Sequence, residues 1–168
     1  MTEVDYALLA LRVWAGVVML AHGINHGRSL EGTANWFEKK GWRAPRLNAM
    51  LSSASEVAVG LGLIVGLLTS IAAAALAATM VAAFWTVHRF SGFFVFRRPD
   101  EGYEYVATLA VVAFAVAVIG PGGISLDAVF GLDESLTGPT GALIFAGGLL
   151  AGVGQVAALW RKPAPAAD

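Results

Sequence analysis

Five ionisable residues lie within or at the ends of apolar stretches of this chain: Arg12, His22, Glu56, His88 and Glu104. If those stretches cross a membrane, each ionised side chain costs several kcal/mol unless it is paired or hydrated. A residue kept at that cost needs either a structural partner or a chemical role. We therefore take these five as the candidate functional residues.

Side chains from three different stretches are predicted to lie at one depth. Counted from the ends of their stretches, His22, His88 and Glu104 all fall near the same membrane surface. Two imidazoles and a carboxylate at that level could hold the head of a quinone by hydrogen bonds and move its protons. The simpler alternative is a hydrogen-bonded network that only caps the helix ends.

Two other cofactors remain open at the same histidines. His22 and His88 could be the axial ligands of one b-type haem. Alternatively, His22 and His26, which are spaced i to i+4, could bind a metal ion. The remaining metal ligand would then be Glu56 or His88. Neither spacing is specific, so we assign no metal ligand from the sequence.

Arg12 and Glu56 are expected to form an ion pair. Helical rise of ~1.5 Å per residue separates them by about 8 Å along the membrane normal, within reach of a bent arginine side chain. The pair either ties the first two spans together or holds Glu56 as a proton carrier. Glu104 is the second candidate proton carrier, and Arg12, His22 and His88 are the candidate contacts to a quinone head.

Five apolar stretches must position these residues, and each approaches the ~20 residues that a ~30 Å hydrocarbon core requires. They are Tyr6–Ile24, Met50–Leu68, Ile71–Val87, Tyr103–Ile119 and Gly141–Trp160. The composition agrees, because 57% of the residues are apolar and only 14% are charged. The sequence therefore predicts an all-α, polytopic membrane helix bundle.

The placement of charge predicts the orientation of the bundle. When the five stretches alternate across a bilayer, every Lys and Arg except Arg12 falls on one side. Lys and Arg in short loops resist translocation, so this side is expected to be cytoplasmic. We predict a multi-pass protein of the bacterial inner membrane, with its amino terminus outside and its carboxyl terminus in the cytoplasm. The cations are Arg28, Lys39, Lys40, Arg43, Arg46, Arg89, Arg97, Arg98, Arg161 and Lys162.

The longest polar segment, residues 26–48, separates the first two stretches. Trp36, Lys39, Lys40 and Arg43 recur there at helical spacing, which predicts a short amphipathic helix lying in the interface. Its aromatic and basic residues are typical of a membrane anchor. A functional lid over a cavity in the bundle is the alternative.

Several classes of chemistry are excluded by composition. The chain contains no cysteine, which rules out disulfides, thiolate nucleophiles, iron–sulfur clusters and Cys-ligated zinc within it. A formal net charge of −1 gives no electrostatic reason to expect nucleic acid as a partner. The partners expected are membrane lipid and a protein, either a soluble oxidoreductase or a larger membrane complex.

A series of motifs follows the candidate residues in order. It comprises Arg12, Ala21-His22-Gly23, Glu56 with Gly60, Gly66–Thr69, His88 with Gly92-Phe93, Glu104, Gly120-Pro121-Gly122 and Ser125-Leu126-Asp127. Over about residues 6–128 this order resembles the DoxX family of small bacterial membrane proteins. The resemblance implies a four-helix membrane bundle associated with quinone-linked redox systems. By position, it assigns the family pattern to Arg12, His22, Glu56, His88, Glu104 and Asp127.

The chain departs from the family pattern at two places. Asn25 and His26 stand where the family commonly has a lysine, and the stretch at 141–160 extends beyond the four-helix unit. We therefore expect a DoxX-like bundle over 1–128, a loop and an additional transmembrane helix over 129–162, and a disordered tail over 163–168. The expected function is that of a quinone-linked subunit of a membrane redox system. The alternative is a non-catalytic accessory or scaffold subunit.

Overall fold

The computed structural model describes residues 1–96 and 101–163, and these residues fold into helices joined by short connections. Among them, seven α-helices and one 3₁₀ turn follow one another along the chain. They are α1 (Glu3–Arg28), α2 (Leu30–Lys39), α3 (Pro45–Val65), α4 (Thr69–Thr86), η1 (His88–Phe90), α5 (Glu104–Ile119), α6 (Leu126–Phe130) and α7 (Gly138–Leu159). The predicted all-α bundle is confirmed. Arg97, Arg98 and residues 164–168 of the expected tail lie outside the described residues.

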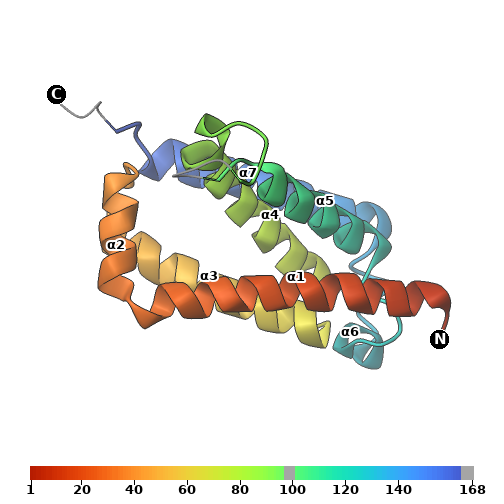
Figure 1. Cartoon of the computed structure of the whole chain (residues 1–168). Coiled ribbons are helices and arrows are strands. Elements are labelled where there is room, and N and C mark those ends of the chain that lie inside the picture. Colours follow the sequence, from red (N-terminus) through yellow and green to blue (C-terminus); the bar gives the residue numbers. More distant parts are fainter. Residues whose placement is uncertain (97–100, 164–168) are drawn as a thin grey trace.

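The five long helices run along the bundle in alternating directions, so that the amino terminus lies near α6 and the carboxyl terminus near α2 (Figure 1). We call these two extremities the α6 end and the α2 end. By length and composition, α1, α3, α4 and α7 could each cross a membrane. The predicted span at 103–119 forms α5, which has 16 residues and is therefore shorter than the others.

Glycines fix how α1 and α3 pack against each other. A Cβ atom on Gly16 would lie 2.7 Å from the carbonyl oxygen of Gly60, and one on Gly23 would lie 2.7 Å from the amide nitrogen of Val57. The two backbones can approach this closely only because these side chains are absent. The register of the antiparallel pair is therefore set at Gly16 and Gly60.

The alanine-rich helix α4 passes obliquely between the α1–α3 layer and the layer of α5 and α7 (Figure 1). Ala73, Leu76 and Ala77 of α4 are fully buried in the main core. On α7, a Cβ atom at Gly148 would overlap the carbonyl oxygen of Ala74, so α7 rests directly on the α4 backbone. The additional helix is thus packed into the bundle through α4.

The predicted amphipathic helix forms as α2, which crosses the α2 end of the bundle (Figure 1). Its residues Ala34 and Phe37 are buried together with Trp42, Val156 and Trp160 in a second apolar cluster. Glu38 stays exposed. This helix therefore covers the end of the bundle where the cations lie.

Candidate functional site

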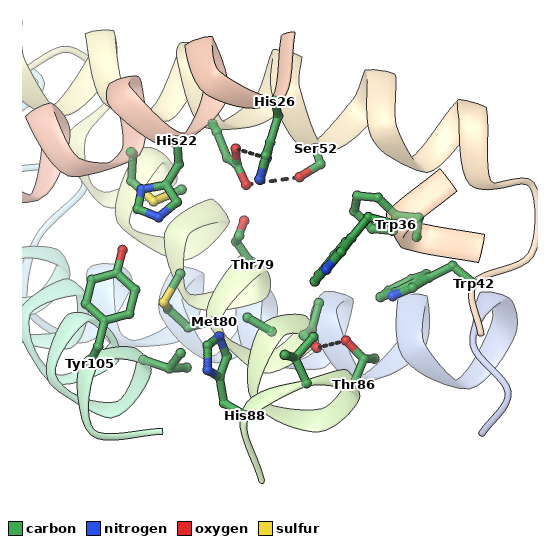
Figure 2. A pocket seen from close by; sticks show the side chains of 17 residues that line it. His22, His26, Trp36, Trp42, Ser52, Thr79, Met80, Thr86, His88 and Tyr105 are labelled. Carbon is green, nitrogen blue, oxygen red and sulfur yellow. Dashed lines mark hydrogen bonds and ion pairs between the residues drawn. The ribbon is translucent and has the colours of Figure 1, made fainter. Parts of the chain in front are cut away.

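A cavity of about 230 Å³ lies between the helix layers, next to α2 and on the inner side of the bundle. Its lining comes from α1, α2, α3, α4, η1 and α5 and from the loop after α2. Figure 2 shows how the polar side chains among them converge on one space. The lining residues are Met19, His22, His26, Trp36, Phe37, Trp42, Ser52, Glu56, Thr79, Met80, Ala82, Ala83, Thr86, Val87, His88, Tyr105 and Val106.

The polar centre of the cavity is a pair formed by His26 and Glu56. The Nδ1 atom of His26 lies 2.9 Å from Oε2 of Glu56, and the Ser52 hydroxyl donates a hydrogen bond of 3.0 Å to Oε1 (Figure 2). Glu56 is buried and His26 is half-buried. A carboxylate, an imidazole and a hydroxyl in contact can hold a proton and pass it on at this point.

The other two histidines are oriented by backbone carbonyls. Nδ1 of His22 lies 2.9 Å from the carbonyl oxygen of Val18, and Nδ1 of His88 lies 2.7 Å from that of Glu101. Since a carbonyl only accepts, Nδ1 carries the proton in both rings. The Nε2 atom of each ring is then the nitrogen that remains available to a ligand.

Tyr105 brings a phenol into the cavity from the first turn of α5. Its ring stacks on His22, with the ring centroids 6.0 Å apart, and its hydroxyl is directed toward that histidine in Figure 2. The phenol can both donate and accept a hydrogen bond. Together, His22, His88 and Tyr105 offer polar groups on the side of the cavity opposite Ser52.

The remaining walls and the size of the cavity suit one apolar ring. Met19, Met80, Val106 and Phe37 supply an apolar surface. The volume exceeds the about 150 Å³ of an engineered protein cavity that binds benzene. In addition, the indole N–H of buried Trp42 has no hydrogen-bond partner among the described residues. The residues present therefore fit the head of a quinone, which carries polar oxygens on a flat ring.

The same residues do not fit a haem or a metal centre. A volume of about 230 Å³ falls below the ~300–1,000 Å³ of ordinary ligand pockets, and a haem macrocycle is larger than a single ring. Within residues 1–96 and 101–163, no group of three or more His, Asp or Glu side chains is placed to hold a metal ion.

The prediction that Arg12 and Glu56 form an ion pair is wrong. Arg12 is fully buried near the α6 end, where its guanidinium donates to backbone carbonyls. The bond to Ile64 is 2.7 Å, that to Leu63 is 2.9 Å and that to Pro121 is 3.1 Å, and a further bond reaches Ile124. The last carbonyls of a helix have no partner within it, and a cation is favourable there. Arg12 therefore binds the end of α3 and the loop after α5.

The register of α1 and α3 explains this outcome. Arg12 lies four residues before Gly16, and Glu56 lies four residues before Gly60. Because the helices are antiparallel, these steps lead in opposite directions from the level where the two glycines meet. The resulting separation is about 12 Å along the helix axes. Counting from predicted helix ends underestimated it.

Asp127, which the family resemblance also singled out, acts at the same end of the bundle. Its carboxylate accepts from the backbone N–H groups of Leu68, at 2.7 Å, and Thr69, at 2.8 Å. These amides begin α4 and have no partner within the helix. Asp127 is therefore a cap for α4 supplied from α6, and neither it nor Arg12 lines the cavity.

Glu104 is likewise not among the residues that line the cavity. It begins α5, where its carboxylate accepts a hydrogen bond of 3.2 Å from the backbone N–H of Val95. A carboxylate is favourable at the start of a helix. The expectation that Glu104 lies beside His22 and His88 in one site is not met, because the next residue, Tyr105, takes that place.

The structure thus brings together three of the five candidate residues: His22, Glu56 and His88. Sequence reasoning missed Tyr105 and Ser52 and considered His26 only as a metal ligand. Helical spacing was the available signal, because Ser52 stands four residues before Glu56 and His26 four residues after His22. No pattern in the sequence pointed to Tyr105.

Comparison with known proteins gives one match. The DoxX family model matches residues 7–89, which include most of α1, all of α2 to α4, and with them His22, His26, Glu56 and His88. The match ends before α5, so it does not extend to Glu104, Asp127 or α7. No curated protein and no solved structure matches the chain. The helical bundle, the apolar spans and the family match agree, and residues 7–89 of this multi-pass membrane protein match the DoxX family.

Proposed function

We propose that this protein is a quinone-linked subunit of a membrane redox system, with the cavity under α2 as its quinone site. The observation that carries the proposal is that the His26–Glu56 pair, with its buried carboxylate, lines an apolar cavity of the size of one ring. When bound, a quinone would supply two-electron redox chemistry coupled to protons. A soluble or membrane-bound partner would exchange the electrons.

Different residues of the cavity would bind the ring and transfer protons. Nε2 of His22 and of His88 would accept hydrogen bonds from the hydroxyls of the reduced ring, the quinol, since Nδ1 of each donates its proton to a carbonyl. Glu56 would hold or release a proton, with Ser52 and His26 keeping its two oxygens in place. Trp36 and Phe37 would exclude water from the side of the cavity that α2 covers.

The test is a binding measurement that needs no known substrate. Trp36 and Trp42 line the cavity, so a quinone that enters it should quench tryptophan fluorescence. We expect saturable quenching by a short-chain ubiquinone or menaquinone analogue with the purified protein in mild detergent. Loss of one hydrogen bond in H22F or H88F should weaken binding of the reduced analogue, the quinol, by about tenfold.

A matched control uses the acidic residue that lies outside the cavity. E104Q should bind the analogue as the unchanged protein does, whereas E56Q should bind it with altered affinity. If H22F, H88F and E56Q all bind the analogue like the unchanged protein, the cavity is not a quinone site.

We place the α2 end at the cytoplasmic surface of a bacterial inner membrane. The described cations at that end lie in the last or first turns of helices or in the segments that adjoin them (Figure 1). They are Arg28, Lys39, Lys40, Arg43, Arg46, Arg89, Arg161 and Lys162. Glu3, Asp5, Asp133 and Glu134 lie in segments at the α6 end. The excess of Lys and Arg on one side supports this orientation.

An accessory subunit without chemistry of its own is the second candidate. The outer face of α7 favours it: Leu143 and Leu150 are exposed, and a Cβ atom at Gly147 or Gly154 would meet nothing within 4 Å. Small residues on a lipid-facing helix allow another helix to pack closely. Mass spectrometry of the natively tagged protein separates the two functions. A stoichiometric oxidoreductase or retained quinone supports the first, and a complex without either supports the second.

A further inference from the structure

Another hollow, of about 260 Å³, lies at the α2 end and is lined by lysines from two segments that are far apart in the sequence. Lys39 and Lys40 come from the end of α2, and Lys162 comes from the segment after α7. Val87, Phe90, Thr86 and Pro163 complete it. No acidic side chain among the described residues lines this basic hollow.

Backbone hydrogen bonds bring these lysines together. The segment after α7 pairs with the loop after α2 through an antiparallel bridge between Trp42 and Trp160. Arg43 N–H donates to the Leu159 carbonyl at 2.7 Å, and Arg161 N–H donates to the Gly41 carbonyl at 2.9 Å. We call residues 40–43 and 159–161 the latch. Lys39 and Lys162 flank it on either side, so its closure forms the basic hollow.

A side-chain bond and a glycine keep the latch closed. The indole N–H of Trp160 donates a hydrogen bond of 2.7 Å to the carbonyl of Lys40. Gly41 has a φ of +89°, and a Cβ atom there would overlap the carbonyl oxygen of Arg161. Only glycine therefore combines this backbone conformation with such a close approach.

The electrostatics of the hollow call for an anion. Lys39 and Lys162 form no ion pair with a described carboxylate, and the ammonium of Lys162 lies 5.9 Å from the ring centroid of Phe90. The nearby Arg89 stacks on Trp85, 4.2 Å from its ring centroid, and also forms no ion pair with a described carboxylate. Like charges held together repel one another, and a bound anion removes that cost.

The position of the hollow along the bundle indicates which anion would occupy it. α4 ends at Thr86 and α7 ends at Leu159, so the hollow lies just beyond two spanning helices, at the level of lipid headgroups. Phe90, Val87 and Pro163 give it an apolar side. We propose that Lys39, Lys40 and Lys162 form a phosphate site, occupied by the headgroup of an anionic phospholipid. This site is independent of the quinone proposed for the first cavity.

Lipid titration of the purified, full-length protein tests the proposal. Phosphatidylglycerol, phosphatidylcholine and inorganic phosphate are added separately, and bound adducts are counted by native mass spectrometry. Phosphatidylglycerol should bind more tightly than phosphatidylcholine, and K39Q and K162Q should each weaken it about five-fold. Equal binding of inorganic phosphate would support the phosphate site and overturn its assignment to a lipid.

Two sets of variants separate the hollow from general surface charge. R28Q and R46Q remove cations at the same end that do not line it, and they should bind phosphatidylglycerol as before. G41A and the milder W160F disturb the latch but keep all three lysines, and they should also weaken binding. Equal loss in R28Q and K39Q, or unchanged binding in K39Q and K162Q, would overturn the proposal.

Discussion

At the scale of single residues, the buried charges of this protein lie in two separate environments. Arg12 and Asp127 stabilise the α6 end, where each binds backbone groups that a helix terminus leaves without partners. Glu56 binds His26 and Ser52 inside a cavity that a ligand can enter. Arg12 is therefore expected to matter for stability and Glu56 for chemistry.

Replacing Arg12 by leucine should destabilise the protein strongly. The variant leaves the carbonyl oxygens of Leu63, Ile64 and Pro121 without their donor and removes the positive charge opposite Asp127. Breaking such a buried arrangement costs about 3–5 kcal/mol. Equilibrium unfolding in mixed micelles measures it. R28Q, at an exposed position, should change the free energy of unfolding by less than about 0.5 kcal/mol.

The His26–Glu56 pair should show energetic coupling. The free energies of unfolding of H26N, E56Q and the double variant should depart from additivity by about 0.5–3 kcal/mol, as expected for residues in contact. H22N combined with E56Q is the control, because His22 contacts the Val18 carbonyl and the Tyr105 ring. Additivity in the first pair would mean that the contact does not contribute to stability.

At the scale of helices, close packing depends on which face of α7 a glycine occupies. A Cβ atom on Gly148 would overlap the backbone of Ala74, whereas one on Gly147 would meet nothing within 4 Å. G148A should therefore lower the melting temperature in detergent by several degrees, and G147A should leave it unchanged or raise it slightly. A similar loss in both variants would show that α7 does not rest on α4 through this face.

Helix positions were largely predictable from the sequence, but helix registers were not. Hydropathy located all five long helices, since apolar length decides which segments span. α3 nevertheless begins at Pro45, five residues before the predicted Met50, because polar residues can extend a helix beyond its apolar part. Which residue faces Glu56 depends on the contact of Gly16 with Gly60, and no single-sequence pattern encodes that contact.

The candidate site was accordingly predicted in part. His22, Glu56 and His88 do line one cavity. His22 lies near the end of α1 and His88 just after α4, whereas Glu56 lies near the middle of α3. Arg12 was assigned to Glu56 from depth alone. Glu104 was predicted in place of Tyr105 because an ionised side chain in an apolar stretch is costly and therefore indicates a site, whereas a tyrosine there does not. The hydrogen bonds that orient His22 and His88 involve backbone carbonyls, which the sequence does not distinguish.

At the scale of the whole molecule, orientation is directly testable, because the chain has no cysteine. Single cysteines introduced at Lys39 and Asp133 lie at opposite ends of the bundle. In whole cells, an impermeant thiol reagent should label the cysteine at position 133 and should reach that at position 39 only after the membrane is opened. The reverse pattern would place α2 outside the cell.

The cap that Asp127 provides also constrains the order in which the protein is made. The amides of Leu68 and Thr69 must wait for an acceptor that the ribosome adds 59 and 58 residues later. During synthesis, the α3–α4 turn therefore enters the translocon before its amides have the Asp127 carboxylate as acceptor. In the same way, Arg12 enters before the carbonyls of Pro121 and Ile124 have been made. Stalled chains that end before α6 should remain open to quality-control proteases, and resistance should appear once α6 has emerged.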